Sequence, residues 1–124
     1  MFLKFGMAAA FLAASLTPAL AQSASCTRPV PPAALDGANA NKDQMTQQRD
    51  DVVNFIKSSD DYQSCLLADL NAQKVKAQKD KKDLPAGLED AVNAKVQVNQ
   101  REKEKVGGEF NAAVQAYKGK HPKG

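Results

Sequence analysis

The chain has 124 residues, 43% of them hydrophobic and 25% charged, with a formal net charge of +3 at pH 7. This length suits a single small domain, and charges this evenly balanced do not give the concentrated basic face that nucleic-acid binding needs. One histidine, His121, and two cysteines, Cys26 and Cys65, are too few for a zinc site or a rigid Ser-His-Asp arrangement. We therefore expect no catalytic residues, no metal and no cofactor, and a protein that is not an enzyme.

Residues 1–21, MFLKFGMAAAFLAASLTPALA, have the pattern of a secretory signal peptide. Lys4 gives a short positive beginning, an apolar run of about a dozen residues follows, and residues 19–21 have the small-x-small form that precedes cleavage. We predict cleavage between Ala21 and Gln22, which leaves a periplasmic or secreted protein. The apolar run is too short to span a bilayer and no other stretch approaches that length, so we expect no transmembrane segment.

Residues 22–40 are rich in proline and small residues, which favour extended backbone over helix. We expect an extended, Pro-rich strap with the stiffness of polyproline II, which loses little conformational entropy when it is laid along a surface. In this arrangement Val30, Pro31 and Leu35 would cover the groove between two helices.

Two cysteines in an exported protein favour one disulfide bond, between Cys26 and Cys65. If a helix begins at Asn41, Cys65 lies about 36 Å along its axis, and the strap must span that distance at about 2.4 Å per residue, within extended reach. The bond would clasp the strap to the first helix and compensate for a thin core. Two alternatives stay open: free redox-active thiols, and lipidation of Cys26, for which Ser23 stands where an apolar residue is usual.

From about residue 41 to residue 80, glycine and proline are absent and apolar residues recur every three or four positions, which predicts a first long helix. Asn39 or Asn41 can cap its start. Whether the helix continues through Ser58 to Asp61 stays open, because these side chains compete for backbone hydrogen bonds. The predicted core face comprises Met45, Val52, Phe55, Ile56, Ser59, Tyr62, Leu66, Leu70, Gln73 and Ala77.

A turn before Pro85 leads into a second helix, predicted over about 85–117, because proline suits the first helical position and Glu89 and Asp90 suit the positive end of the helix dipole. Its predicted core face comprises Leu88, Val92, Val96, Asn99, Val106, Phe110, Ala113, Val114 and Tyr117. The helical domain would span residues 41–118, followed by a flexible basic tail over 119–124.

Two helices with a short connection pack antiparallel, so we predict an all-α fold: a long two-helix hairpin of the coiled-coil type, fastened by the strap and the disulfide. A turn centred near Asp83 places Leu70 opposite Val96. The two glycines at 107–108 then lie opposite Ser59 and Tyr62, where they either leave room for the Tyr62 ring or form a flexible joint. Each costs a helix about 1 kcal/mol relative to alanine.

A helical hairpin offers surfaces for binding rather than a catalytic cleft. We expect a small exported protein that serves as a periplasmic protein-interaction or assembly module, by binding a protein partner or by self-association. Tyr62, Asn99 and Phe110 are the candidate residues for contacts of the helix face, with Asn99 as a register or water-binding residue. The alternatives are a chaperone-like or stress-related envelope protein and a structural spacer.

The stretch MTQQR, Met45 to Arg49, is similar to the LTxxQ motif of small all-helical periplasmic chaperones of the Spy type. It departs from that motif at both ends, with Met45 in place of leucine and Arg49 in place of glutamine, and it occurs once. The resemblance implies only the chaperone-like alternative, and we do not assign the chain to that family.

Overall fold

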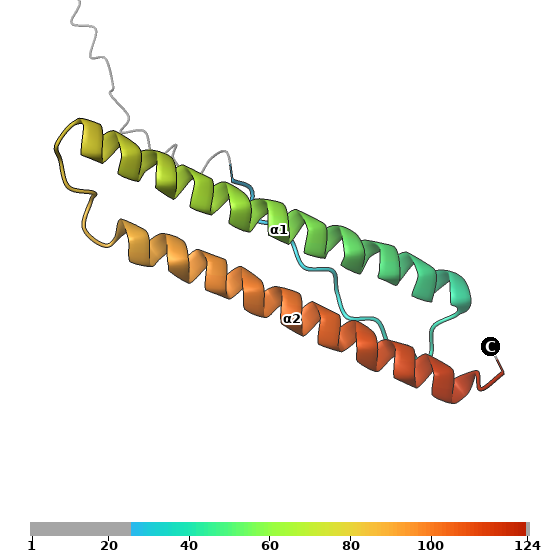
Figure 1. Cartoon of the computed structure of the whole chain (residues 1–124). Helices are drawn as coiled ribbons and strands as arrows, with labels where there is room; N and C mark the ends of the chain where they lie inside the picture. Colours follow the sequence, from blue (N-terminus) through green and yellow to red (C-terminus); the bar gives the residue numbers. More distant parts are fainter. Residues whose placement is uncertain (1–25, 124) are drawn as a thin grey trace, which may run out of the picture.

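The structure, a computed structural model, describes residues 26–123, and within that range it contains two α-helices and no strand. Helix α1 spans Lys42–Lys79 and helix α2 spans Leu88–Lys120, and the two pack side by side (Figure 1). The prediction of an all-helical chain built on two packed helices is thus confirmed. The predicted signal peptide and the cleavage between Ala21 and Gln22 lie outside the described residues.

A capping box fixes the start of α1. The side chain of Asn41 accepts a hydrogen bond from the Gln44 backbone N–H at 2.8 Å, and the Gln44 side chain accepts one from the Asn41 N–H at 2.9 Å. Two N–H groups at the helix start are thereby satisfied. The helix then continues without a break through Ser58 to Asp61, where Ser59 is fully buried against α2.

The loop between the helices ends α1 earlier and begins α2 later than the sequence suggested. Lys81 adopts a left-handed conformation with φ of 52°, and the Lys82 N–H donates to the Ala77 carbonyl at 2.9 Å, which closes the end of α1. Gly87, with φ of 79°, precedes α2, so Pro85 belongs to the turn and the helix begins three residues after the predicted position. At its far end α2 continues through Gly119 to Lys120, so it includes the first two residues of the predicted tail.

The core between the helices consists of two hydrophobic clusters. One joins Cys26, Tyr62, Leu66, Leu70 and Val92, with Cys65, Leu88 and Val96 at its edge. The other joins Val52, Phe55 and Val106, with Ile56 and Phe110 at its edge. Every buried residue of the two helices belongs to one of the predicted core faces, because a three- to four-residue period places those side chains on one side of a helix.

The register of the two helices differs from the predicted one by three residues, nearly one turn. Lys74 Nζ lies 2.8 Å from Glu89 Oε1, whereas the prediction put Ala77 opposite that position. Figure 1 shows the physical reason: α1 extends beyond the start of α2 at the loop end, and the loop turns back to reach α2. Leu70 is buried in one cluster with Val92, and Val96, the residue predicted to lie opposite Leu70, packs against that same cluster.

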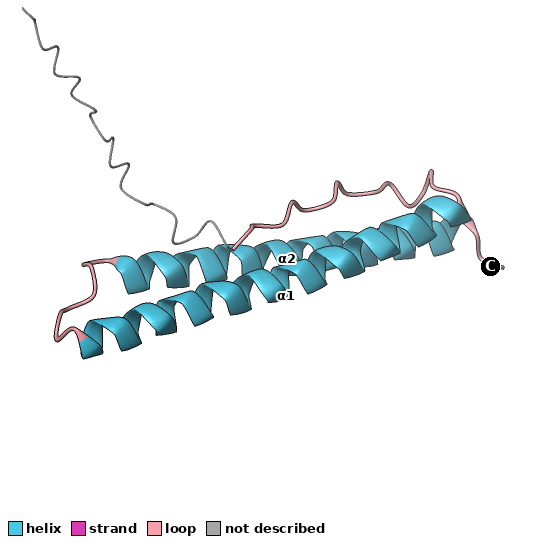
Figure 2. Cartoon of the chain, turned by 90° about the horizontal axis from the view of Figure 1, so that it is seen from above, coloured by secondary structure: helices cyan, strands magenta, loops and turns pink. Residues whose placement is uncertain are grey.

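Residues 26–41, called the N-terminal segment from here on, run extended along the two helices (Figure 2). Their burial has a period of three. From Cys26 to Leu35 the residues turned toward the helices are Cys26, Pro29, Pro32 and Leu35, and the two residues after each of the first three are exposed; beyond Leu35 the period ends, and Gly37 and Ala40 are buried. Three residues per turn is the period of polyproline II. It brings Leu35 inward as predicted, but it turns Val30 and Pro31 outward, so the prediction that these two cover the groove is wrong.

Candidate functional site

Cys26 and Cys65 form a disulfide bond, as predicted from the cysteine count. Their Cα atoms lie 5.6 Å apart, and the bond joins positions separated by 39 residues. Cys26 is buried in the cluster of Tyr62 and Leu66, so this end of the N-terminal segment is held by packing as well as by a covalent bond. The bond makes the segment a fixed part of the helical surface.

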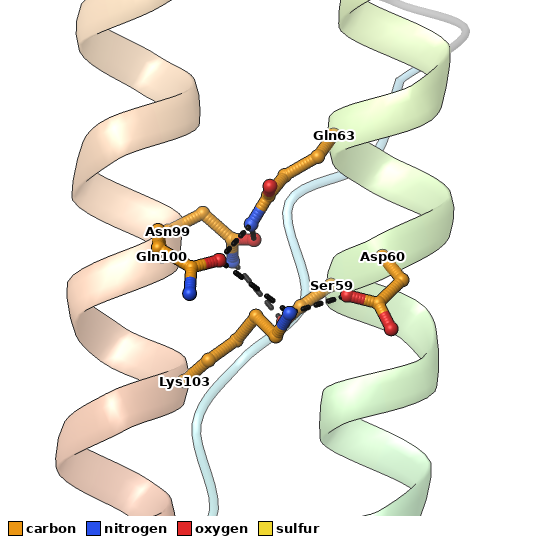
Figure 3. A network of polar contacts seen from close by, with 6 residues as sticks. All are labelled: Ser59, Asp60, Gln63, Asn99, Gln100 and Lys103. Atoms are coloured by element: carbon orange, nitrogen blue, oxygen red, sulfur yellow. Dashed lines mark hydrogen bonds and ion pairs between the residues drawn. The ribbon is translucent and has the colours of Figure 1, made fainter.

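A polar layer crosses the hairpin where the two hydrophobic clusters meet (Figure 3). Asn99 on α2 is 1% exposed and Ser59 on α1 is 0% exposed, and Asn99 Nδ2 donates to Ser59 Oγ at 3.1 Å. Gln63 Nε2 donates to Asn99 Oδ1 at 2.9 Å and approaches Gln100 Oε1 at 3.3 Å. The two buried polar side chains of this layer, Ser59 and Asn99, therefore have partners, which removes most of the free-energy cost of placing them in the core.

The rim of the polar layer carries an ion pair between Asp60 and Lys103, and Lys103 Nζ also lies 3.5 Å from Gln100 Oε1. In Figure 3 the N-terminal segment passes behind the layer, so this rim opens on the other face of the hairpin. The centre of the layer consists of amide and hydroxyl groups, which can fix the alignment of two helices. They form no pair of nucleophile and base.

The three residues predicted to offer a helix face for binding lie in or against the core. Tyr62 is buried in one hydrophobic cluster, Asn99 is buried in the polar layer, and Phe110 packs half-buried against the other cluster. The contacts described for all three are with residues of this chain, and all three belong to the helix faces that the periodicity predicted to form the core.

The outward surface of α1 carries large apolar side chains that the sequence analysis did not single out. Val53, Leu67 and Val75 are 56%, 46% and 44% exposed. At about 100° per residue they lie within about 80° of one another around the helix, spread over about 33 Å of its length, with the exposed polar residues Asp60, Ser64 and Asn71 between them on the same face. We call these three residues the α1 stripe. These three residues are apolar but do not belong to the three- to four-residue pattern of the core face. That mismatch is visible in the sequence and could have identified them.

Two grooves flank the N-terminal segment. One, of about 400 Å³, lies against α2 and is lined by Pro31, Pro32, Ala33, Ala34, Glu102, Lys105, Val106 and Glu109. The other, of about 430 Å³, lies against α1 and is lined by Pro29, Val30, Pro32, Asp51, Asn54, Phe55 and Ser58. The segment is therefore a ridge between two hollows.

Charges around the ridge pair with each other. Arg28 on the segment forms an ion pair with Glu102 on α2, and Lys105 Nζ lies 3.6 Å from Glu109 Oε1 one turn away. On the α1 side, Gln48 Nε2 donates to the Ala33 carbonyl at 2.9 Å. The Arg28–Glu102 pair and the Gln48 bond hold the segment to both helices, and the paired charges leave the ridge close to neutral.

His121 caps the end of α2 rather than joining a cluster of reactive groups. Its ring stacks on Tyr117 with centroids 4.3 Å apart, and Nδ1 lies 3.0 Å from the Tyr117 carbonyl oxygen. Among residues 26–123, no group of three or more His, Cys, Asp or Glu side chains is arranged to hold a metal ion. No helix in that part of the chain has the length and apolar character needed to cross a membrane.

Comparisons of the chain with models of known families, with curated proteins and with solved structures found no match.

Proposed function

We propose that the chain is a small exported, non-enzymatic helical protein that acts as a periplasmic protein-interaction or assembly module. The observation that carries this proposal is the α1 stripe, formed by Val53, Leu67 and Val75 on the outward face of a long helix. Isolated exposed apolar residues are common on protein surfaces, but these three, although separated by polar residues, share one helix face that a single partner can reach along its length. An amphipathic helix or an apolar groove on the partner suits such a face.

The stripe is presented by a scaffold that we propose to be an antiparallel two-helix hairpin with a Pro-rich strap clasped to it. The ion pairs Lys74–Glu89 and Asp60–Lys103 support the antiparallel arrangement, because positions later in α1 pair with positions earlier in α2. The disulfide and the three-residue burial period support the strap. A rigid scaffold lowers the conformational entropy lost on binding and so favours affinity from a modest contact area.

Export is supported by two independent features. Residues 1–21 have the composition of a secretory signal peptide, and Cys26 and Cys65 form a disulfide, a bond that persists in oxidising compartments. Together they favour a periplasmic or secreted location for the mature chain.

The chaperone-like alternative is favoured by a different observation. Val30 on the N-terminal segment and Val98 on α2 are 87% and 45% exposed, so apolar side chains also lie away from the α1 stripe. Dispersed apolar contacts suit transient binding of many unfolded chains rather than one stable partner. Suppression of the aggregation of an unrelated unfolding protein at equimolar ratio, without a stable co-purifying partner, would favour this alternative over the assembly module.

Photo-crosslinking in the native envelope tests the module directly. The mature protein would carry p-benzoylphenylalanine in place of Val53, and a matched protein would carry it in place of Gln97, an exposed polar position on α2. We expect a discrete protein adduct from position 53 that is absent from position 97 and that falls at least tenfold when Leu67→Asp is added. Equal, diffuse labelling from both positions would count against a dedicated partner.

A further inference from the structure

The side chains of the N-terminal segment form three rows along its length, and one of these rows packs against the helices. A polyproline II helix has three residues per turn, so its side chains form three rows along a triangular rod. The row that contains Pro29, Pro32 and Leu35 faces the helices. The other two rows remain outward.

The two outward rows are mainly apolar. One contains Thr27, Val30 and Ala33, and the other contains Arg28, Pro31 and Ala34; all six residues are exposed. Val30, at 87%, is the most exposed large hydrophobic residue in the described part of the chain. Neither row is buried against the helices, and although Pro31 also stiffens the segment, the exposed side chain of Val30 has no such role in the fold.

The shape around these rows fits one kind of partner. The groove toward α2 and the groove toward α1 run on either side of the segment, so side chains from a partner can enter both while its surface rests on Val30 and Pro31. Proline-rich polyproline II rods are recognised by surfaces lined with aromatic side chains, whose flat rings pack against the rod. Trp and Tyr add a donor for the rod's carbonyl groups, because polyproline II makes no internal hydrogen bonds.

Charge favours a protein surface over an anionic membrane. The basic groups beside the ridge each have a carboxylate next to them, Glu102 beside Arg28 and Glu109 beside Lys105. Attraction to anionic lipid requires a cluster of unpaired basic residues, which this ridge does not present. The affinity for a partner must therefore come from apolar and aromatic contacts.

The segment is also held before any partner arrives. The disulfide fixes it at Cys26, the Arg28–Glu102 pair and the Gln48 bond to Ala33 hold its middle, and Gly37 packs on α2. A free proline-rich peptide loses conformational entropy on binding, whereas this one has already lost it on folding.

We propose that the outward rows of the N-terminal segment, centred on Val30 and Pro31, are the docking surface for a protein that presents an aromatic-lined groove for polyproline II. This inference rests on the proposed function as a protein-interaction module and names its surface and its partner class. It places that surface on the segment, which is a different face from the α1 stripe.

The test places p-benzoylphenylalanine at Ala33 in the full mature protein in its native envelope, with mass spectrometry to map the crosslinked residue. We expect an adduct whose partner residue lies in an aromatic-lined groove. Val30→Asp, added to the same protein, should reduce the adduct at least tenfold, while Val53→Asp should leave it within twofold. Both substitutions are at exposed positions, and an unchanged helical circular dichroism spectrum would show that the fold is intact.

An adduct to lipid, to glycan or to a second copy of this chain would overturn the docking proposal, as would an adduct that Val30→Asp leaves unchanged. The crosslinker at position 53 separates the two proposals. If the crosslinker at position 53 gives a protein adduct and the crosslinker at position 33 gives none, the proposal of a protein-interaction module is supported. The proposal that the N-terminal segment is its docking surface is then wrong. No protein adduct from either position would remove both.

Discussion

The backbone of Gly37 in the N-terminal segment lies directly against the backbone of Ala113 in α2. A Cβ atom built on Gly37 would come within 1.8 Å of the Ala113 carbonyl oxygen. Because that oxygen belongs to a helix backbone, it cannot rotate away as a side chain can. Glycine is therefore required here by close approach, and this contact fixes the end of the segment opposite the disulfide.

Gly37→Ala is expected to destabilise the protein by about 1–3 kcal/mol, because either the segment or α2 must shift to admit the methyl group. For a domain of this size, each kcal/mol lowers Tm by about 4–8 °C. Thermal unfolding of the oxidised mature protein, followed by circular dichroism, measures the change. An unchanged Tm would mean that the segment can lift from α2 without loss.

Gly107→Ala is the matched substitution with the opposite expected sign. Gly107 lies inside α2, and a Cβ built on it meets nothing within 4 Å. Replacing glycine by alanine in a helix interior gains about 1 kcal/mol, so Tm should rise by roughly 4–8 °C. Of the two roles considered for this glycine, space for the Tyr62 ring is wrong, because the ring packs with Leu66 and Leu70 and a Cβ on Gly107 would meet no atom of it. A fall in Tm would show that α2 needs the flexibility of glycine here.

The double variant Cys26→Ser/Cys65→Ser is expected to lose about 4 kcal/mol of stability. The disulfide closes a loop between positions 39 residues apart, and chain entropy of the unfolded state gives that magnitude. Urea unfolding of the variant, compared with the oxidised protein, measures the difference. A loss below about 1 kcal/mol would indicate that packing and ion pairs alone hold the segment, and that the bond adds little.

The helix faces were predictable because burial follows a local rule. Val52, Phe55 and Leu66 repeat at helical spacing, and that spacing alone places them on one side. The register was not predictable from such a rule, because it depends on how the loop around Lys81 and Gly87 folds. A lysine in the left-handed conformation has no sequence signature comparable to that of glycine.

The candidate site divides in the same way. The disulfide followed from the cysteine count, and the extended character of the N-terminal segment followed from its prolines. Which residues of the segment face outward depends on how the segment is rotated about its own axis relative to the helices. The buried position of Cys26 sets that rotation. Polyproline II repeats every three residues, so counting from a buried Cys26 gives Pro29, Pro32 and Leu35 as the inward residues. This result could have been predicted from the sequence by assuming the disulfide and a polyproline II conformation.

Asn99 and Ser59 give the last prediction, which concerns specificity as well as stability. Asn99→Ala leaves Ser59 and Gln63 without their buried partner, so we expect a loss of about 1–3 kcal/mol in urea unfolding. The double variant Asn99→Leu/Ser59→Ala removes both polar groups from the centre of the layer and should recover most of that loss. Recovery is expected because an apolar pair needs no hydrogen bond, while a single polar group left behind does.

In the double variant, the recovered stability should be accompanied by the loss of a single, well-defined register between α1 and α2. A buried asparagine fixes helix register because only one alignment satisfies its hydrogen bonds, whereas leucine packs acceptably in several. Size-exclusion chromatography and the dispersion of amide NMR signals would report this, as mixed oligomers or broadened resonances in the double variant. A double variant that is monodisperse, with sharp signals and full stability, would show that the clusters around Leu66 and Phe55 set the register without the polar layer.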